Sequence, residues 1–143
     1  MGTILIATDA DWIADEVDAA LADDKTMLVH VTEGKDVRAV ALEHDGDLDL
    51  VILDLQIGNM GGMATCMDLR HEEGAGRLDP VPVLMLLDRS PDVFLAKRSG
   101  ADGWLVKPLD AVRLRRASDA LRRGETYTEH ADVVTVPAVA ATD

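Results

Sequence analysis

The chain alternates short apolar runs with amphipathic segments, and this alternation constrains its fold more than any other feature. Five apolar runs have the length of buried β-strands, at residues 3–8, 26–31, 49–54, 81–87 and 103–106. A segment with helical spacing follows each run. Repeated strand and helix units predict a parallel sheet covered by helices on both faces, with right-handed crossovers. We therefore expect an α/β fold, a doubly wound five-stranded sheet with the flavodoxin-like strand order 2-1-3-4-5.

Apolar spacing indicates which helix faces are buried. The first two helices have one apolar face each, formed by Ile13, Val17, Ala20 and Leu21, and by Val37, Val40, Ala41 and His44. The third begins with Met60, Met63 and Met67, a stripe that we interpret as core packing.

Capping residues mark the last two helices. Ser90 and Pro91 suit the N-cap and first position of a fourth helix that closes before Gly100. Asp110 suits the cap of a fifth helix that ends at Gly124. We place the domain at residues 1–124. Residues 125–143, which include VVTVPAVAA, form a tail of uncertain order that could add an edge strand or pack on a partner.

The composition is that of one soluble domain. A chain of 143 residues can bury one sizeable core but not two. No apolar run is long enough to span a membrane and no secretion signal is evident, so we expect a cytoplasmic protein. The lone Cys66 cannot form an internal disulfide and is expected to be a small buried apolar residue. The net charge of −13 opposes direct binding to nucleic acid or to anionic lipid.

Charged side chains stand at the ends of three predicted strands. Asp9 follows the first strand, Asp54 ends the third, and Lys107 with Pro108 follows the fifth. With strand order 2-1-3-4-5, the first and third strands flank the switch point where ligands gather. Asp9 and Asp54 are then neighbours, with Lys107 close by. An isolated Asp at a strand end is usually a turn residue or a cap, but this combination favours a site.

Four segments, ILIATDAD, DLVILDLQIGNMGG, PVLMLLD and SGADGWLVKPLD, resemble the receiver domain of bacterial two-component response regulators, the CheY-like proteins, over residues 3–123. The resemblance implies a role in phosphorelay signal transduction, with Asp54 accepting a phosphoryl group from a histidine kinase or a small phosphodonor. It also implies Mg²⁺ bound by Asp9, Asp54 and the backbone carbonyl of Gln56. Lys107 would hold a phosphoryl oxygen, and the bond before Pro108 would be cis.

The chain departs from the family pattern at several site positions. Thr8 stands where receivers usually have a second acidic residue, which predicts weaker binding of Mg²⁺. Leu87 and Asp88 stand where the family usually has a hydroxyl residue and then Ala, so the usual hydroxyl contact to the phosphoryl group is missing. Trp104 takes the place of the aromatic switch residue. Gly58 replaces a usual proline, and we expect greater backbone freedom there.

These departures leave two interpretations open. In the first, the chain is an atypical, stand-alone response regulator that is phosphorylated on Asp54 and acts through protein contacts. In the second, it is a pseudo-receiver that binds a partner whatever the state of Asp54. We do not expect an enzyme beyond phosphoryl transfer to its own Asp54, because no nucleophile elbow or phosphate-binding glycine loop is present.

The fifth helix concentrates arginines in an otherwise acidic chain. The simplest interpretation of its sequence, DAVRLRRASDALRRGE, is a solvent-exposed helix face on which Asp119 pairs with Arg122 or Arg123. The alternative is a partner face that includes Arg113, Arg116 and Arg123 and suits an acidic protein. The resemblance implies that the fourth helix, fifth strand and fifth helix form such a face, for an unknown partner or for a homodimer.

Overall fold

The computed structural model describes residues 2–129, which form one parallel five-stranded sheet in the order β2-β1-β3-β4-β5. The strands are β1 (Gly2–Ala7), β2 (Thr26–Val31), β3 (Leu48–Asp54), β4 (Val83–Leu87) and β5 (Gly103–Val106). The α/β class and the strand order are confirmed. The fourth strand begins two residues later than predicted, after Pro82, which has no N–H to donate to a neighbouring strand.

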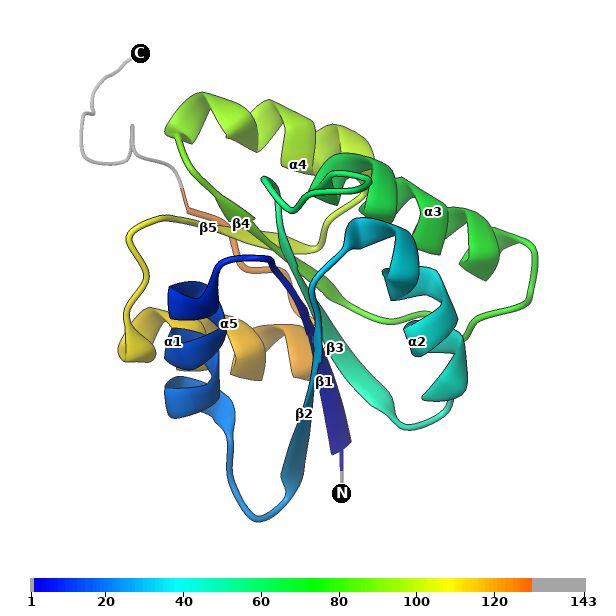
Figure 1. Ribbon diagram of the computed structural model, residues 1–143, viewed down its shortest axis with the longest axis horizontal. Coiled ribbons are helices and arrows are strands. Elements are labelled where there is room, and N and C mark those ends of the chain that lie inside the picture. Colours follow the sequence, from blue (N-terminus) through cyan, green and yellow to red (C-terminus); the bar gives the residue numbers. More distant parts are fainter. Residues whose placement is uncertain (1, 130–143) are drawn as a thin grey trace.

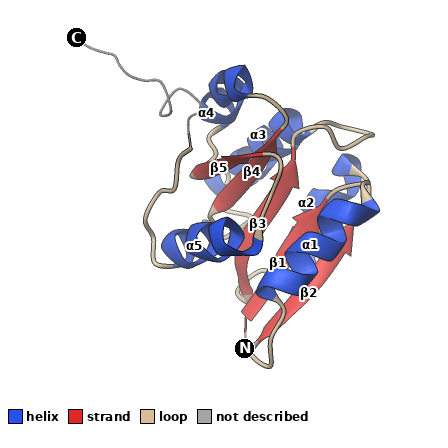
Figure 2. Ribbon diagram, turned by 90° about the vertical axis from the view of Figure 1, so that its left-hand side faces the viewer, coloured by secondary structure: helices blue, strands red, loops and turns tan. Residues whose placement is uncertain are grey.

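Helices cover both faces of the sheet (Figures 1 and 2). They are α1 (Asp11–Leu21), α2 (Val37–Glu43), α3 (Gly62–Gly74), α4 (Val93–Ser99) and α5 (Ala111–Arg122), with 3₁₀ turns η1 (Gly34–Asp36) and η2 (Ser90–Asp92) before α2 and α4. One face carries α1 and α5, and the other carries α2, α3 and α4.

Alternate residues of each strand pack into opposite layers of the core. In β3, Leu50 and Ile52 pack with α1 and α5, whereas Val51 and Leu53 pack with the other three helices. Because both faces are covered, the central strands are continuously apolar instead of alternating. The predicted apolar face of α1 is buried, and Cys66 is buried in the layer beneath α3, as expected.

The methionine stripe was wrongly assigned to the core. Met60 and Met67 are 37% and 49% exposed, and only Met63 packs against the core. The helix begins at Gly62, after Met60, and its buried face is set by Thr65, Cys66, Leu69 and Glu72 instead. A spacing of three or four residues places side chains on one face of a helix, but it does not show whether that face packs against the sheet.

Two of the predicted helix ends are confirmed and one start is different. The Arg113 N–H donates to Asp110 Oδ1 over 2.9 Å, which caps α5, and Gly100 closes α4 with φ 89°. The fourth helix begins only at Val93, because Ser90 and Pro91 form the 3₁₀ turn η2. There the Arg89 N–H donates to the Asp92 carboxylate over 3.2 Å.

The described chain continues past residue 124 and lies along β5. Tyr127 forms a parallel bridge with Gly103, and the Trp104 N–H donates to the Tyr127 carbonyl over 2.9 Å. An edge pairing therefore exists, but it is made by the first residues of the tail. The segment VVTVPAVAA lies outside the described residues. Between residues 2 and 129, no helix combines the length and the apolar character needed to cross a bilayer.

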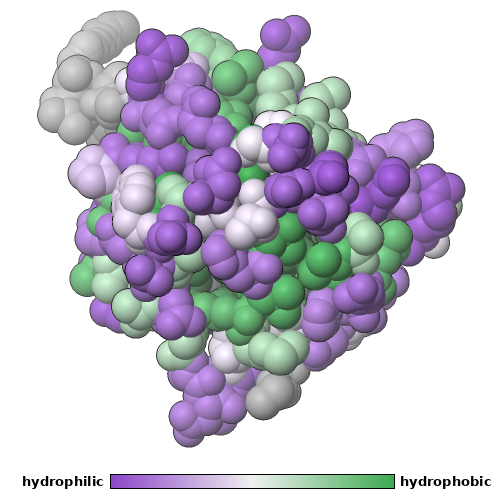
Figure 3. Space-filling view, in the orientation of Figure 1, coloured by the Kyte–Doolittle hydropathy of each residue, from purple (hydrophilic) through white to green (hydrophobic). Residues whose placement is uncertain are grey.

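The surface is mostly hydrophilic on the face seen in Figure 3, with apolar residues between polar ones. This agrees with a chain in which acidic residues outnumber basic ones by 27 to 14.

Candidate functional site

The carboxyl ends of β1, β3, β4 and β5 meet at one edge of the sheet and bring the predicted residues together. Asp54 is the last residue of β3, Thr8 and Asp9 follow β1, Asp88 follows β4, and Lys107 follows β5. Parallel strands end at the same edge, so residues far apart in the sequence become neighbours. The Lys107–Pro108 peptide bond is cis, as the resemblance implied.

Asp54 is a buried carboxylate with three hydrogen-bond donors. Its Oδ1 accepts from Lys107 Nζ over 2.8 Å and from the Gln56 N–H over 3.1 Å, and its Oδ2 accepts from Thr8 Oγ1 over 2.7 Å. Only 2% of the residue is exposed. A charge this far from water requires such partners, because desolvation is costly unless hydrogen bonds and an opposite charge replace the lost hydration.

Lys107 binds two carboxylates at once. Its Nζ donates to Asp54 Oδ1 over 2.8 Å and to Asp88 Oδ1 over 2.9 Å, and its side chain is 11% exposed. Burial acts to lower the pKa of Lys107, but the hydrogen bonds that it donates to Asp54 and Asp88 outweigh burial and raise the pKa above its ordinary value of 10.5. Lys107 is therefore a cation at neutral pH, and Asp88 neutralises part of its charge.

Asp9 faces the loop that follows Asp54. Its Oδ2 accepts from the Gly58 N–H over 2.9 Å, and a Cβ atom at residue 58 would lie 3.2 Å from the same oxygen. The Gly58 carbonyl in turn accepts from the Gly34 N–H over 3.0 Å. The expected backbone freedom at Gly58 is thus limited by hydrogen bonds on both sides. The left-handed conformations of this loop fall at Asn59 and Met60, with φ of 50° and 82°.

The other two atypical positions lie in the core. Leu87 is fully buried and belongs to the layer beneath α2, α3 and α4, so it offers the site no polar group. Trp104 is also buried, and its indole Nε1 donates to the backbone carbonyl of Glu129 over 2.9 Å. The indole therefore lies beneath the segment that follows α5.

The donor atoms at this edge fit a magnesium ion that keeps several waters. Asp9, Asp54 and the Gln56 carbonyl supply hard oxygen ligands, and Mg²⁺ is commonly bound through one or two carboxylates. Among residues 2–129, no group of three His, Cys, Asp or Glu side chains forms a complete metal cage. Thr8 occupies the position of a further acid, and its hydroxyl already donates to Asp54.

Two of the three arginines proposed for a partner face have partners within the chain. Arg113 binds Glu129 and the carbonyls of Val106 and Pro108, and Arg123 pairs with Glu125 over 3.1 Å. Arg116 is exposed. The predicted pairing of Asp119 within α5 is present, with Arg122 at 3.4 Å.

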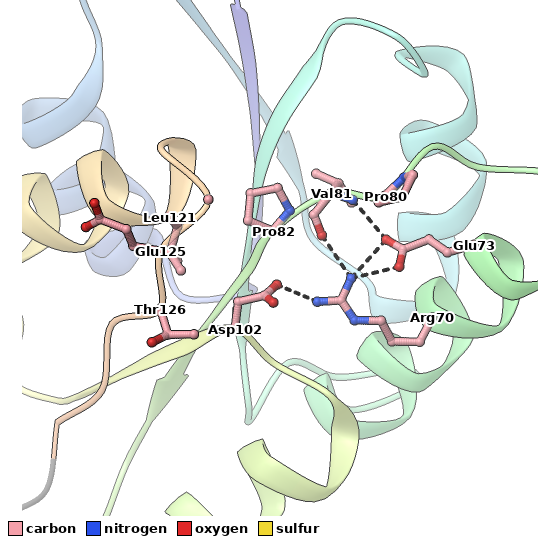
Figure 4. Close-up of a pocket in the computed structure, with 10 residues that line it drawn as sticks. Arg70, Glu73, Pro80, Val81, Pro82, Asp102, Leu121, Glu125 and Thr126 are labelled. Carbon is pink, nitrogen blue, oxygen red and sulfur yellow. Dashed lines mark hydrogen bonds and ion pairs between the residues drawn. The ribbon is translucent and has the colours of Figure 1, made fainter.

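A second polar cluster, centred on Arg70, lies at the opposite end of the sheet and lines a cavity of about 360 Å³ (Figure 4). Arg70 donates to Glu73, to Asp102 over 2.6 Å, and to the carbonyls of Val81 and Gly100. This guanidinium joins α3 to the starts of β4 and β5 and to the end of α4. The sequence around Arg70 indicates at most its pairing with Glu73 three residues on, because the other partners lie before β4 and in the loop between α4 and β5.

Comparison with known proteins agrees with this geometry. A sequence model described as "Response regulator receiver domain" matches residues 4–119. The nitrate/nitrite response regulator NarL of Escherichia coli is 29% identical over 131 residues, covering 90% of this chain and 58% of NarL. RpaA of Synechocystis, a DNA-binding dual master transcriptional regulator, is 33% identical over 134 residues, covering 92% of this chain and 54% of RpaA. The chain thus spans somewhat more than half the length of these relatives.

Solved structures show the same fold. The receiver domain of a signal transduction histidine kinase from Syntrophus aciditrophicus has a TM-score of 0.71 and 31% identity, covering 87% of this chain and 92% of that one. CheY in the CheX-CheY-BeF3-Mg complex from Borrelia burgdorferi has a TM-score of 0.70 at 19% identity, covering 80% and 84%. The chain belongs to the response regulator receiver domain family, whose members are signalling modules of two-component systems.

Proposed function

We propose that Asp54 is a phosphoryl acceptor that works with Mg²⁺ and that the chain signals through protein contacts. The observation that carries this proposal is the buried Asp54 carboxylate with the Lys107 ammonium 2.8 Å away. A buried carboxylate with a fixed cation beside it has the arrangement that phosphoryl transfer needs, since positioning and charge neutralisation supply most of the rate.

The transfer makes one bond and breaks one. A carboxylate oxygen of Asp54 attacks the phosphorus atom of an acyl phosphate or a phosphohistidine. A new P–O bond forms, the bond from phosphorus to the donor's oxygen or nitrogen breaks, and the donor leaves with that electron pair. The attacking oxygen first has to give up the hydrogen bonds that it accepts: the one from Thr8 at Oδ2, or those from Lys107 and Gln56 at Oδ1. Lys107 remains close enough to hold a phosphoryl oxygen.

Mg²⁺ would be held by Asp9, Asp54 and the Gln56 carbonyl, and it would neutralise charge on the incoming phosphate. The Borrelia neighbour, whose complex includes Mg²⁺ and BeF3, supports the choice of this metal for the fold. Thr8 contributes a hydroxyl in place of a carboxylate, so the site holds the ion less strongly than a site with three acids does.

The proposed donor is a histidine kinase, a phosphotransfer protein or a small phosphodonor, and the proposed output surface is formed by α4, β5 and α5. Phe94 of α4 and Val112 of α5 are exposed apolar residues on the two helices that flank β5. Apolar side chains left in water beside charged ones are typical of protein interfaces. We place the protein in the cytoplasm, where such donors act.

The second candidate is a pseudo-receiver that binds its partner without phosphorylation. The pairing of Asp88 with Lys107 favours this candidate, because the ammonium group that would bind the phosphoryl group is already paired with an acidic side chain. The buried Leu87 favours it as well, because it offers no hydroxyl to report the modification.

The intact mass of the protein after incubation with acetyl phosphate and Mg²⁺ separates the two candidates. We expect one added phosphoryl group in the unaltered chain and none in Asp54→Asn, which keeps the size of the side chain and hence the fold. Omission of Mg²⁺ should reduce the adduct strongly. Equal labelling of Asp54→Asn would contradict the acceptor assignment, and a folded protein with no adduct would favour the pseudo-receiver.

A further inference from the structure

The outer edge of β5 is covered by residues 126–129 of the chain itself, here called the C-terminal strap. β5 is the edge strand of the sheet that residues 2–129 form, so its outward N–H groups face none of the other four strands. The strap fills that position: the Trp104 N–H donates to the Tyr127 carbonyl over 2.9 Å, and the Tyr127 N–H donates to the Asp102 carbonyl over 3.3 Å. A Cβ atom at Gly103 would lie 2.4 Å from the Tyr127 oxygen, so the close approach depends on this glycine.

Glu129 anchors the strap through its side-chain carboxylate and its backbone carbonyl. Its Oε1 accepts from the Val106 N–H over 3.1 Å, and its Oε2 accepts from Arg113 Nε over 2.6 Å. The Arg113 Nη2 also contacts Oε1, which makes the pair bidentate. The Glu129 carbonyl accepts from Trp104 Nε1 over 2.9 Å.

The groups that receive Glu129 are positioned by the rest of the domain. Arg113 lies in the first turn of α5, and it also donates to the Pro108 carbonyl over 2.6 Å and to the Val106 carbonyl over 2.7 Å. Val106 belongs to β5, and Trp104 is held in the core. Three donors from separate positions thus converge on one carboxylate and one carbonyl. A preorganised set of donors binds its ligand at a lower entropic cost.

The strap itself has few contacts that would make it permanent. Thr126 and Thr128 are exposed, and Tyr127 is only half-buried. Tyr127 is its one side chain packed against the core layer beneath α1 and α5. The rest of its described attachment consists of backbone pairs and the contacts of Glu129. Segments with few buried apolar contacts open at a low free-energy cost.

We propose that the edge of β5 is a binding site for an extended acidic segment, occupied by the C-terminal strap as a tethered ligand. A partner protein that presents an extended segment with the same chemistry would take the site by displacing the strap. The required chemistry is a backbone that pairs with Gly103 and Trp104 and, two residues after the pairing residue, a carboxylate that reaches Arg113 and the Val106 N–H. Strand addition of this kind derives affinity from the backbone and specificity from the side-chain contact. The proposal does not depend on phosphorylation of Asp54.

Amide hydrogen exchange in the full chain tests whether the strap stays paired with β5. We expect the Val106 and Trp104 amides to exchange slowly in the unaltered protein and at least tenfold faster in Glu129→Ala. The matched control is Glu125→Ala, which removes an acid just before the strap, where it pairs with Arg123 at the end of α5. Free exchange of both amides in the unaltered chain, or equal exchange in the two variants, would overturn the proposal.

Titration with a peptide of the strap's own sequence, ETYTE, tests the site itself. NMR shifts of the Val106 amide and the Trp104 indole report binding even when it is weak. We expect the peptide to bind Glu129→Ala at least tenfold more tightly than the unaltered chain, and a peptide ending in Ala to bind neither. Absence of binding to Glu129→Ala would overturn the site, and equal affinity for both proteins would overturn its occupation by the strap.

Discussion

At the scale of single residues, the site is defined by how two carboxylates share one ammonium group. Asp54 and Asp88 both accept from Lys107 Nζ, at 2.8 and 2.9 Å. The Asp54 carboxylate is buried, whereas Asp88 is more exposed and exchanges its contact with Lys107 for water at lower cost. We therefore expect Asp88 to compete with a phosphoryl group for the Lys107 ammonium.

Replacing Asp88 should release Lys107 toward the phosphoryl group. An ion pair with this exposure contributes about 0.5–1 kcal/mol, so Asp88→Asn should accelerate adduct formation from acetyl phosphate by about two- to fivefold. The initial rate is read from intact mass. The control is Asp24→Asn, which removes the same charge from an exposed turn and should leave the rate unchanged. A rate in Asp88→Asn equal to or below that of the unaltered protein would show that Asp88 does not compete.

Thr8 sets the charge available for a cation. Its hydroxyl donates to Asp54, so the carboxylates proposed to hold the cation are Asp9 and Asp54, whereas Asp88 pairs with Lys107. Introducing a third carboxylate with Thr8→Asp should raise the affinity for Mg²⁺ on the order of tenfold, because affinity for hard cations rises with the number of charged oxygen ligands. Calorimetric titration measures the change. The control is Thr8→Asn, because asparagine has nearly the shape of aspartate without its charge. Its affinity for Mg²⁺ should not rise, and an equal rise in both variants would contradict the charge argument.

At the scale of elements, the Arg70 cluster joins helices and strands at the end of the sheet opposite the site. One guanidinium reaches Glu73 on its own helix, Asp102 before β5, and carbonyls at Val81 and Gly100. A lysine in its place could not reproduce this planar set of donors. The ends of four segments are therefore fixed relative to one another by one side chain.

Removing that side chain should destabilise the whole domain. Arg70→Met leaves Glu73 and Asp102 without their cation, and we expect the free energy of unfolding to fall by about 2–4 kcal/mol. Arg122→Met is the matched control, because the ion pair of Arg122 with Asp119 at 3.4 Å is exposed and its loss should cost less than about 0.5 kcal/mol. Urea unfolding followed by tryptophan fluorescence gives both values. Similar losses in the two variants would show that Arg70 does not join the elements.

At the scale of the whole molecule, the fold is easier to predict from the sequence than the side-chain contacts are. Strands buried on both faces must be continuously apolar, so the order of elements can be predicted from periodicity. Asp54 and Lys107 could be placed together because parallel strands end at one edge. The exposure of Met60 and Met67 could not be predicted, because their spacing is compatible with either the buried or the exposed side of a helix.

Contacts between distant segments were the least predictable part of the molecule. No local pattern indicates that Glu129 binds Arg113, or that Asp88 shares Lys107 with Asp54. Such pairs form because the fold brings together groups that have lost their water, and the sequence around each residue looks like an ordinary solvated segment.

The most direct test of the account is to locate the phosphoryl group itself. After incubation with acetyl phosphate and Mg²⁺, borohydride reduces an aspartyl phosphate to homoserine with loss of phosphate, which marks the acceptor permanently. Peptide mass mapping of the treated protein should place homoserine at residue 54 and leave Asp9 and Asp88 unchanged. Homoserine at Asp9 or Asp88, or none at all in a folded protein, would contradict the assignment of Asp54 as the acceptor.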